Sequence, residues 1–447
     1  MVTVEPLSAL PALEPGTPTA VAEIAPFVTT LTPAPAVVVA ARSGADVAAA
    51  VAWAAASGRR VSVQATGHQL LSDLADTVLV STRHLDAVHV DPEGATATVG
   101  GGARWSRVIA AAAPHGLMPV CGSSSQVGVA GFCLGGGHGP LSRTLGVASD
   151  RVRRLRVVAA DGVEHDVDAD RDPDLFWALR GGKTGFGVVT ELEIELVALT
   201  ELYGGGAFFP GASAPELLRT WAEWAPTLPE QASTSIALLR LPPDPALPPF
   251  LQGAFVAHLR FAFVGDPANG DRLLAPMRAV VEPLADLAAP MPAAALDAIH
   301  SDPTTPIAIL DESATLGALP TEAVDALLAV AGPGVEIPLI MAELRLLGGA
   351  IRRAPAGGDA VAGRDAAFHL YALAPMAAPV AEVAPLAAKS VVDALRPWAL
   401  AQLPNFVGPA GGGRLAGCWD DATFARLVAT RDAHDPAGVF RAGLTLT

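Results

Sequence analysis

Two short segments of the sequence combine glycine with histidine in a way that suits backbone contact with a ligand. Residues 127–139 hold six glycines in thirteen positions and end in Gly-Gly-Gly-His-Gly, which contains His138. A second segment places His68 directly after Gly67, where an expected strand ends in a polar turn. Glycine allows close approach to backbone amides and costs roughly 0.5–1 kcal/mol against alanine in a regular element. We therefore interpret the glycine run as a cofactor cradle, with a nucleotide phosphate as the first hypothesis.

Two common phosphate-binding motifs do not match these glycines. A nicotinamide fold needs Gly-x-Gly-x-x-Gly between a strand and a long helix, and residues 135–139 do not have that spacing. The full Walker spacing, Gly-x-x-x-x-Gly-Lys-Ser/Thr, does not occur either. The sequence therefore favours a phosphate cradle of another kind.

Periodicity and turn residues predict the elements that carry these segments. Ser43 is an expected N-cap for a helix that runs to Gly58. In the first half we expect strands at 60–64, 78–81, 87–90, 95–99 and 154–158, a helix at 105–115, and a strand pair at 186–197. Beyond residue 200 we expect helices at 215–224, 270–287, 321–330 and 380–396, strands at 233–240, 253–264 and 336–347, and a last helix at 420–431.

Composition excludes several classes of function. The chain has 447 residues and a formal net charge of −16, so it has no basic footprint for nucleic acid. No stretch is long and uncharged enough for a membrane span, and no charged segment followed by an apolar one marks a classical signal peptide. Cys121, Cys133 and Cys418 have no CxxC spacing, which favours reduced thiols over disulfides or zinc. We expect a cytoplasmic protein.

The pattern of expected elements changes near residue 200, where longer helical patterns begin, and this change divides the chain into two parts. Seven prolines in residues 1–35 predict an extended surface segment rather than a helix. Residues 36–200 form one expected domain, which residues 401–447 complete, and residues 201–400 form a second. The fold class that we predict is α+β.

Taken in order, the motifs resemble a known family. They are Thr66-Gly67-His68, His115-Gly-Leu117, the glycine run, Asp174–Gly182, Phe186–Thr190, Glu343–Ala350, Asn405-Phe406 and His434-Asp-Pro-Ala-Gly-Val-Phe-Arg441. Together they are similar to the FAD-linked oxidases of the vanillyl-alcohol oxidase and p-cresol methylhydroxylase (PCMH) superfamily, and most to the berberine-bridge-enzyme-like branch. The resemblance implies a two-domain FAD-binding (PCMH-type) fold with a separate α+β substrate domain.

The resemblance also implies which residues hold FAD. The loop after the first long strand would bind the pyrophosphate through backbone N–H groups, and His68 would attach to the 8α carbon of the flavin. The family loop reads Arg-Gly-Gly-Gly-His-Ser, whereas this chain has Gln-Ala-Thr-Gly-His-Gln, so noncovalent FAD remains an alternative. The implied FAD contacts are Gln64, Ala65, Thr66, Gly67, His68, Gln69, Leu70, Ser124, Val127, Gly128, Gly131, Gly135, Gly136, Gly137, His138, Gly139, Leu141, Asp150, Gly187, Val188, Val189 and Asn405.

A second flavin link, to cysteine, is not expected. The family position for that cysteine falls on Ser124, and Cys121 lies three residues too early. Val127 falls on the position that lines the oxygen pocket in relatives, where valine is associated with oxidase behaviour. The glycine run becomes the expected wall of the flavin ring, while the pyrophosphate belongs chiefly to the loop at His68.

The implied chemistry is hydride transfer from an alcohol, sugar or amine C–H to flavin N5, with O2 as the final acceptor. A tyrosine that assists deprotonation in relatives is replaced here by Leu403, two residues before Asn405. On strands, His369 with Tyr371 and Glu343 with Arg345 would each share a face, which makes them candidates for proton transfer and substrate orientation. An FAD-dependent dehydrogenase, or a flavin-containing cyclase or non-redox enzyme, remains an alternative, and so does a catalytically silent ligand-binding protein.

The sequence excludes some classes of partner but does not identify the substrate. We expect a small-molecule substrate and O2, no nucleic acid or membrane, and a monomer or homodimer. The apolar bias of residues 201–400 favours a hydrophobic substrate of the kind found in secondary metabolism.

Overall fold

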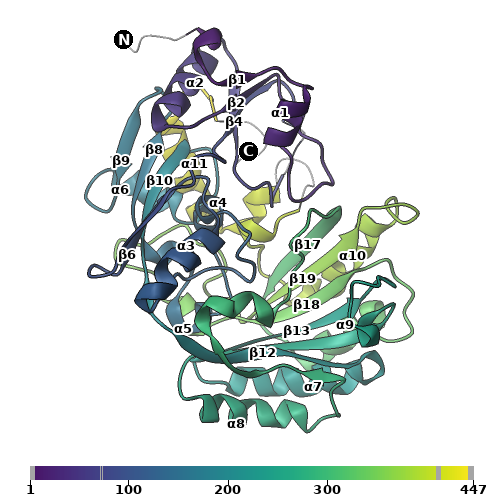
Figure 1. The fold of residues 1–447 in the computed structure, drawn as a ribbon. Helices are drawn as coiled ribbons and strands as arrows, with labels where there is room; N and C mark the ends of the chain where they lie inside the picture. Colours follow the sequence, from purple (N-terminus) through teal and green to yellow (C-terminus); the bar gives the residue numbers. More distant parts are fainter. Residues whose placement is uncertain (1–5, 71, 73, 409–413, 441–447) are drawn as a thin grey trace.

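A computed structural model describes residues 6–70, 72, 74–408 and 414–440. The chain folds into two parts that meet along a broad junction, with residues of the first half at the top of Figure 1 and the large sheet at the bottom. The last helix, in yellow, packs back among the elements of the first half. The ends of the expected terminal segments, 1–5 and 441–447, lie outside the described residues, as does Arg441.

The first half contains a small parallel sheet and a larger antiparallel one. The order β1-β2-β4-β3 is parallel except at β1, and the order β5-β6-β10-β8-β9 is antiparallel throughout. A short pair, β7 with β11, completes this half. The strands are β1 Ala12–Leu13, β2 Val37–Ala40, β3 Arg60–Gln64, β4 Thr77–Ser81, β5 Val88–Asp91, β6 Thr96–Gly100, β7 Leu117–Met118, β8 Val152–Val158, β9 Glu164–Val167, β10 Val188–Glu195 and β11 Val197–Ala198.

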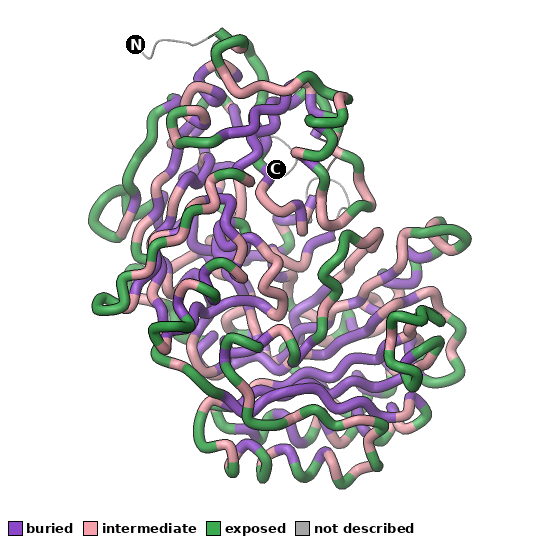
Figure 2. Tube along the Cα trace, in the orientation of Figure 1, coloured by how far each residue is buried: buried purple, intermediate pink, exposed green. Residues whose placement is uncertain are grey.

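The second half is built on one large antiparallel sheet of order β15-β12-β14-β13-β18-β19-β17, with β16 also paired to β12. Its central strands are buried along most of their length (Figure 2). The strands are β12 Glu201–Pro210, β13 Ala232–Arg240, β14 Phe255–Phe263, β15 Ala285–Asp286, β16 Ala289–Pro292, β17 Ile309–Leu316, β18 Met341–Leu346 and β19 Phe368–Pro375.

Alternation along these strands gives the large sheet two different faces. One face carries apolar residues, among them Leu259, Ile236, Leu344 and Leu370, and packs on helices α7 to α10 in a single core. The opposite face carries polar residues and turns toward the first half of the chain. The helices of the whole chain are α1 Pro18–Glu23, α2 Gly44–Ala56, α3 Trp105–Ala112, α4 Val129–Leu134, α5 Ser142–Leu145, α6 Pro173–Leu179, α7 Ala214–Trp224, α8 Pro267–Arg278, α9 Thr321–Ala331, α10 Ala384–Ala394 and α11 Asp421–His434.

Local signals in the sequence were most reliable where capping and turn residues agreed. Ser43 caps α2 in a capping box with Asp46, and Gly58 follows the helix with φ +65°. Two predictions were wrong. Residues 1–35 contain a helix, α1, because Thr17 accepts a hydrogen bond from Ala20 N and Pro18 suits the first helical turn. The expected helix 270–287 ends at Arg278, and its last part pairs with β12 as β15.

No helix in the described part of the chain combines the length and apolar character needed to cross a membrane. Cys121, Cys133 and Cys418 are buried, and no disulfide joins them in the described part of the chain.

Candidate active site

The loop after β3 is held closed by the N-terminal segment. Gly67 has φ +69°, and a Cβ at this position would lie 2.5 Å from Pro26 Cα, so only glycine fits here. The backbone N–H groups of Phe27 and Val28 both donate to Gly67 O. The ring of Phe27 stacks on His68 with centroids 4.1 Å apart. The segment that the sequence predicted to be only a surface extension therefore positions the histidine.

His68 presents one free ring nitrogen. Its Nδ1 hydrogen bonds with Thr66 Oγ1 at 2.8 Å, whereas Nε2 is buried and has no partner within the described residues. Burial, with the positive charge of Arg104, lowers the pKa of His68 to about 4. At neutral pH the imidazole is therefore uncharged, and the tautomer in which Nδ1 donates to Thr66 leaves a lone pair on Nε2.

A cationic pocket of about 210 Å³ adjoins the same loop. Arg83 and Arg104 line it together with Thr66, and the buried Nε of Arg83 has no partner among the described residues. Arg107, on the rim, pairs with Asp86 at 2.8 Å. Excess positive charge beside a loop of small residues suits a diphosphate.

The glycine run contains glycines of two kinds. A Cβ at Gly139 would lie 1.9 Å from Cys121 O, so this glycine is required by packing. Gly131 is the opposite case: it lies inside helix α4, is exposed, and a Cβ there would meet no atom within 4 Å. A helical glycine with open space in front of it stabilises nothing in the protein itself. It leaves room for a flat ligand against the helix.

Asn405 and Lys183 connect three segments around the glycine run. Asn405 Nδ2 donates to Phe132 O at 2.9 Å, and its Oδ1 accepts from Lys183 Nζ at 2.6 Å. Lys183 Nζ also donates to Gly131 O at 3.0 Å. Gln69 Nε2 donates to Pro404 O and Val407 O, which joins the segment around Asn405 to the loop of His68. Lys183 was not among the residues predicted from the sequence, although it lies in a Gly-Lys-Thr tripeptide at 182–184.

A row of polar residues crosses the face of the large sheet that turns toward the glycine run. Strand register pairs Arg260 with Ser235, Ser235 with Arg345, and Arg345 with His369. The row two residues further along contains His258, Glu343 and Tyr371. The expected same-face pairs, Glu343 with Arg345 and His369 with Tyr371, are therefore confirmed, whereas their catalytic roles stay predictions.

Glu343 is a fully buried carboxylate between two arginines. Its Oε1 accepts from Arg260 Nη1 at 2.5 Å, and its Oε2 accepts from Arg345 Nε at 2.8 Å. Burial alone would raise the pKa of Glu343, but the charges of Arg345 and Arg260 outweigh burial and hold it well below its usual range. A carboxylate held in this way is a poor proton acceptor. Its contacts instead fix the orientation of Arg345.

His369 has the free lone pair that Glu343 lacks. Neither ring nitrogen has a partner in the described part of the chain, and both are buried. Burial, together with the charge of Arg345, keeps the pKa of His369 well below its ordinary value, so the ring is neutral. Tyr371 beside it donates to Asp311 Oδ2 at 3.3 Å. Burial and the Asp311 charge raise the pKa of Tyr371, so it remains a phenol donor.

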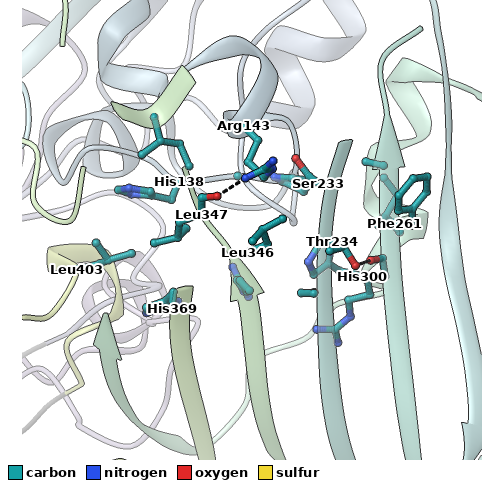
Figure 3. Close-up of a pocket in the computed structure, with 18 of the residues that line it drawn as sticks. His138, Arg143, Ser233, Thr234, Phe261, His300, Leu346, Leu347, His369 and Leu403 are labelled. Carbon is teal, nitrogen blue, oxygen red and sulfur yellow. Dashed lines mark hydrogen bonds between the residues drawn. The ribbon is translucent and has the colours of Figure 1, made fainter. Parts of the chain in front are cut away.

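A cavity lined by both polar and apolar residues lies at the junction of the two halves (Figure 3). His138 comes from the glycine run, Arg345 and His369 from the sheet, and Leu403 from the C-terminal segment. Side-chain atoms at the cavity that have no hydrogen-bond partner among the described residues include His138 Nε2, Ser235 Oγ and His300 Nδ1. The enclosed volume is about 50 Å³, enough for a few water molecules, so a substrate needs space beyond these walls as well.

Several other expected contacts are explained by packing in the protein itself. Asp150 accepts from Val147 N and pairs with Arg364 at 2.5 Å, so its carboxylate is already engaged. A Cβ at Gly187 would lie 2.6 Å from Val157 Cγ1. Ser124 Oγ accepts from Gln126 N. The roles of these residues toward a cofactor stay predictions, as do those of Gln64, Ala65, Leu70, Val127, Gly128, Gly135, Gly136, Gly137, Leu141, Val188 and Val189.

Because several buried histidines are neutral in the folded protein, we expect the protein to lose stability in acid. Burial lowers the pKa of His138 and of His300 to about 3, with Arg364 and Arg260 respectively adding to the effect. Below about pH 6.5 these histidines bind protons in the unfolded chain but not in the folded chain. The free energy of unfolding therefore falls by up to about 1.4 kcal/mol per pH unit for each such histidine. Urea unfolding at pH 7 and pH 5 measures this, and His138→Gln should reduce the slope. Equal stability at both values would contradict the assignment of neutral buried rings.

Comparison with known proteins gives a family match within the first half of the chain. Residues 35–168 match the family model described as FAD binding domain. They form an FAD binding domain. Among curated proteins, (R)-6-hydroxynicotine oxidase of Paenarthrobacter nicotinovorans is 33% identical over 199 residues, which is 44% of this chain and 40% of the relative. The FAD-dependent monooxygenase prx3 of Penicillium roqueforti is 31% identical over 206 residues, 45% of this chain and 40% of the relative.

The likeness to solved structures extends over the whole chain. It covers 96% of this chain and 96% of 6-hydroxy-D-nicotine oxidase from Arthrobacter nicotinovorans, with a TM-score of 0.82 and 22% identity. For BBE-like 1 of Physcomitrella patens the TM-score is 0.83 at 20% identity, covering 98% and 96%. For the xylooligosaccharide oxidase of Myceliophthora thermophila, solved with xylobiose, it is 0.83 at 20% identity, covering 97% and 96%.

These findings confirm the fold class, the FAD-linked oxidase resemblance and FAD as the cofactor of the domain at 35–168. The chain nonetheless matches only about two fifths of the length of the curated relatives at the sequence level. The family model covers residues 35–168, so it describes the FAD domain and not the cavity at the sheet.

Proposed function

We propose that the protein is an FAD-dependent oxidase that removes a hydride from a C–H group next to oxygen or nitrogen in a small molecule. The observation that carries this proposal is the junction cavity, where the glycine run of the FAD domain faces the polar face of the large sheet. FAD, when bound, supplies the electron acceptor, and once reduced it carries an additional negative charge. The named relatives include oxidases for nicotine derivatives and oligosaccharides.

The residues present fit FAD. The loop at His68 offers small residues and a cationic pocket for a diphosphate, and the unpartnered Nε2 of His68 can take a covalent bond. The exposed helical glycine at 131 leaves space for a flat ring system. Asn405 and Lys183 lie at the edge of that space with polar groups.

His369 is the proton acceptor that we propose. It combines a neutral ring, two unpartnered nitrogens and a place at the cavity, whereas Glu343 is committed to two arginines and Tyr371 to Asp311. Arg345, fixed by Glu343, would orient a substrate oxygen or nitrogen, and Tyr371 would support the His369 ring. His369 then replaces the tyrosine whose place Leu403 takes.

Reoxidation by O2 is the part of the proposal that separates an oxidase from a dehydrogenase. Valine at position 127 supports the oxidase, because the resemblance associates valine at this position with oxidase behaviour. Turnover of a substrate in air should release hydrogen peroxide, whereas a dehydrogenase should need an added acceptor. We also propose that the substrate carries hydroxyl or amine groups, since the cavity, although largely apolar, also presents neutral hydrogen-bonding groups.

The covalent bond at His68 is directly testable. We expect the yellow colour of the purified protein to remain with the pellet after acid precipitation, because His68 Nε2 is neutral and unpartnered. His68→Ala should release all colour to the supernatant. Thr66→Val, which removes the hydroxyl that holds Nδ1, should lower the covalent fraction without abolishing FAD binding. Colour that leaves the unaltered protein completely on precipitation would show that FAD is held noncovalently.

A further inference from the structure

Lys183 is a cation placed against the glycine run, and it pairs with no carboxylate among the described residues. Its Nζ donates to two neutral oxygens, Gly131 O at 3.0 Å and Asn405 Oδ1 at 2.6 Å. An ammonium group has three N–H donors, so one is left for another acceptor. The backbone of the lysine loop is tied to the same wall, since Gly181 N and Lys183 N both donate to Leu134 O.

The choice of lysine at this position is unusual for this chain. Of its 29 basic residues only two are lysines, Lys183 and Lys389, and all the others are arginine. Lys389 is exposed and pairs with Asp393 on helix α10. A lysine differs from an arginine in being a compact charge whose pKa responds strongly to its surroundings. A position that keeps lysine in an arginine-dominated sequence is one where those properties are useful.

The surroundings make Lys183 sensitive to a nearby negative charge. Burial lowers the pKa of Lys183 to about 7, and the charge interaction with Cys418 opposes this shift. Lys183 also has φ +71°, a backbone conformation that directs the side chain of this loop residue back toward Gly131. Any anion brought against the wall at Gly131 would therefore favour the charged form of the lysine.

We propose that Lys183 is the cation that stabilises the negative charge of the reduced flavin. The inference rests on the proposed FAD site. When substrate hydride reaches the cofactor, two electrons and one proton are transferred, and the ring gains one negative charge. The ammonium group of Lys183 then stabilises the negative charge of the ring. If Lys183 is neutral before the reduction, it first takes one proton from solvent. Asn405 is then a positioning residue, because its carboxamide holds the ammonium against the glycine run.

The two-lysine composition allows a direct test on the unaltered protein. Selective 13C labelling of lysine gives two side-chain signals, and their pH titration can be followed with FAD oxidised and after reduction by dithionite without oxygen. We expect the proton affinity of Lys183 to rise about tenfold on reduction and that of Lys389 to stay constant. A rise of less than about threefold at Lys183 would overturn the proposal.

Sulfite binding gives a second measurement, because sulfite adds to flavin N5 and leaves a negative charge on the ring. We expect Lys183→Met to weaken sulfite binding about tenfold, Lys183→Arg to weaken it less, and the control Lys389→Met to leave it unchanged. Unchanged sulfite affinity in Lys183→Met would contradict the role. Neither measurement needs a substrate, so both are independent of the oxidase assignment, and a protein that binds no FAD fails the proposed function instead.

Discussion

Replacing His369 by glutamine is expected to lower kcat by about 10²–10⁴-fold, because a positioned proton acceptor contributes about that much to a reaction of this kind. Glutamine preserves most of the side-chain volume next to Phe406, whose ring centroid lies 4.5 Å from that of His369. It removes the basic nitrogen. KM should change much less than kcat, since Arg345 and its partner Glu343 remain in place.

The control for this variant is His258→Gln. His258 is also buried on the same face of the sheet, but it stacks on Phe208 and does not line the cavity. Steady-state kinetics of both variants, with flavin content measured in each, separate a catalytic effect from a structural one. Equal losses in the two variants, or a His369 variant that keeps its rate, would show that His369 is not the proton acceptor.

Replacing Gly131 by alanine is expected to have opposite effects on the protein and on its cofactor. Alanine is favoured over glycine inside a helix by about 0.5–1 kcal/mol, and the added Cβ meets no protein atom within 4 Å, so the apoprotein should become more stable. The same methyl group would enter the space that we assign to the flavin ring. FAD affinity should fall by an order of magnitude or more, about 1.4 kcal/mol for each factor of ten.

Thermal unfolding of the apoprotein and FAD titration, both in a His68→Ala background that forms no covalent flavin bond, measure the two effects separately. Gly139→Ala is the contrasting variant, because its Cβ would lie 1.9 Å from Cys121 O and should destabilise the protein with or without FAD. If Gly131→Ala protein bound FAD as tightly as the unaltered protein, the flavin could not lie against helix α4.

The sequence predicted those parts of the site in which the information is local. The turn at Gly67-His68, the glycine run and the shared faces of the pairs on β18 and β19 depend on spacing along one segment. The pairing of Arg260 with Glu343 and of Tyr371 with Asp311 depends on strand register between residues 83 and 60 positions apart. No pattern within a single strand contains that register, so neither Arg260 nor Asp311 was among the expected residues.

Strand β12 shows why some elements were missed. Its sequence contains Gly204-Gly205-Gly206, which is typical of a loop rather than a strand. The structure gives two of these glycines a packing reason. A Cβ at Gly206 would lie 2.1 Å from His258 Nε2, and one at Gly205 would lie 2.4 Å from Leu287 O. The residues that require glycine here belong to other strands and loops, and only the folded chain brings them together.

The stacking of Phe27 on His68 was missed for a similar reason. The prolines of the first 35 residues predict an extended segment, which is wrong at α1. They do not indicate that the segment returns to the loop at Gly67, which depends on contacts more than 35 residues apart along the chain.

An FAD-dependent oxidase must pass electrons from its substrate to the flavin and then to O2. The decisive measurement is flavin absorbance while the purified protein is mixed, without oxygen, with a panel of alcohols, sugars and amines and then exposed to air. We expect at least one compound to bleach the flavin, and air to restore the absorbance with release of one hydrogen peroxide per substrate oxidised. A compound that the protein converts without any bleaching would contradict the oxidase and favour a non-redox enzyme on the same fold.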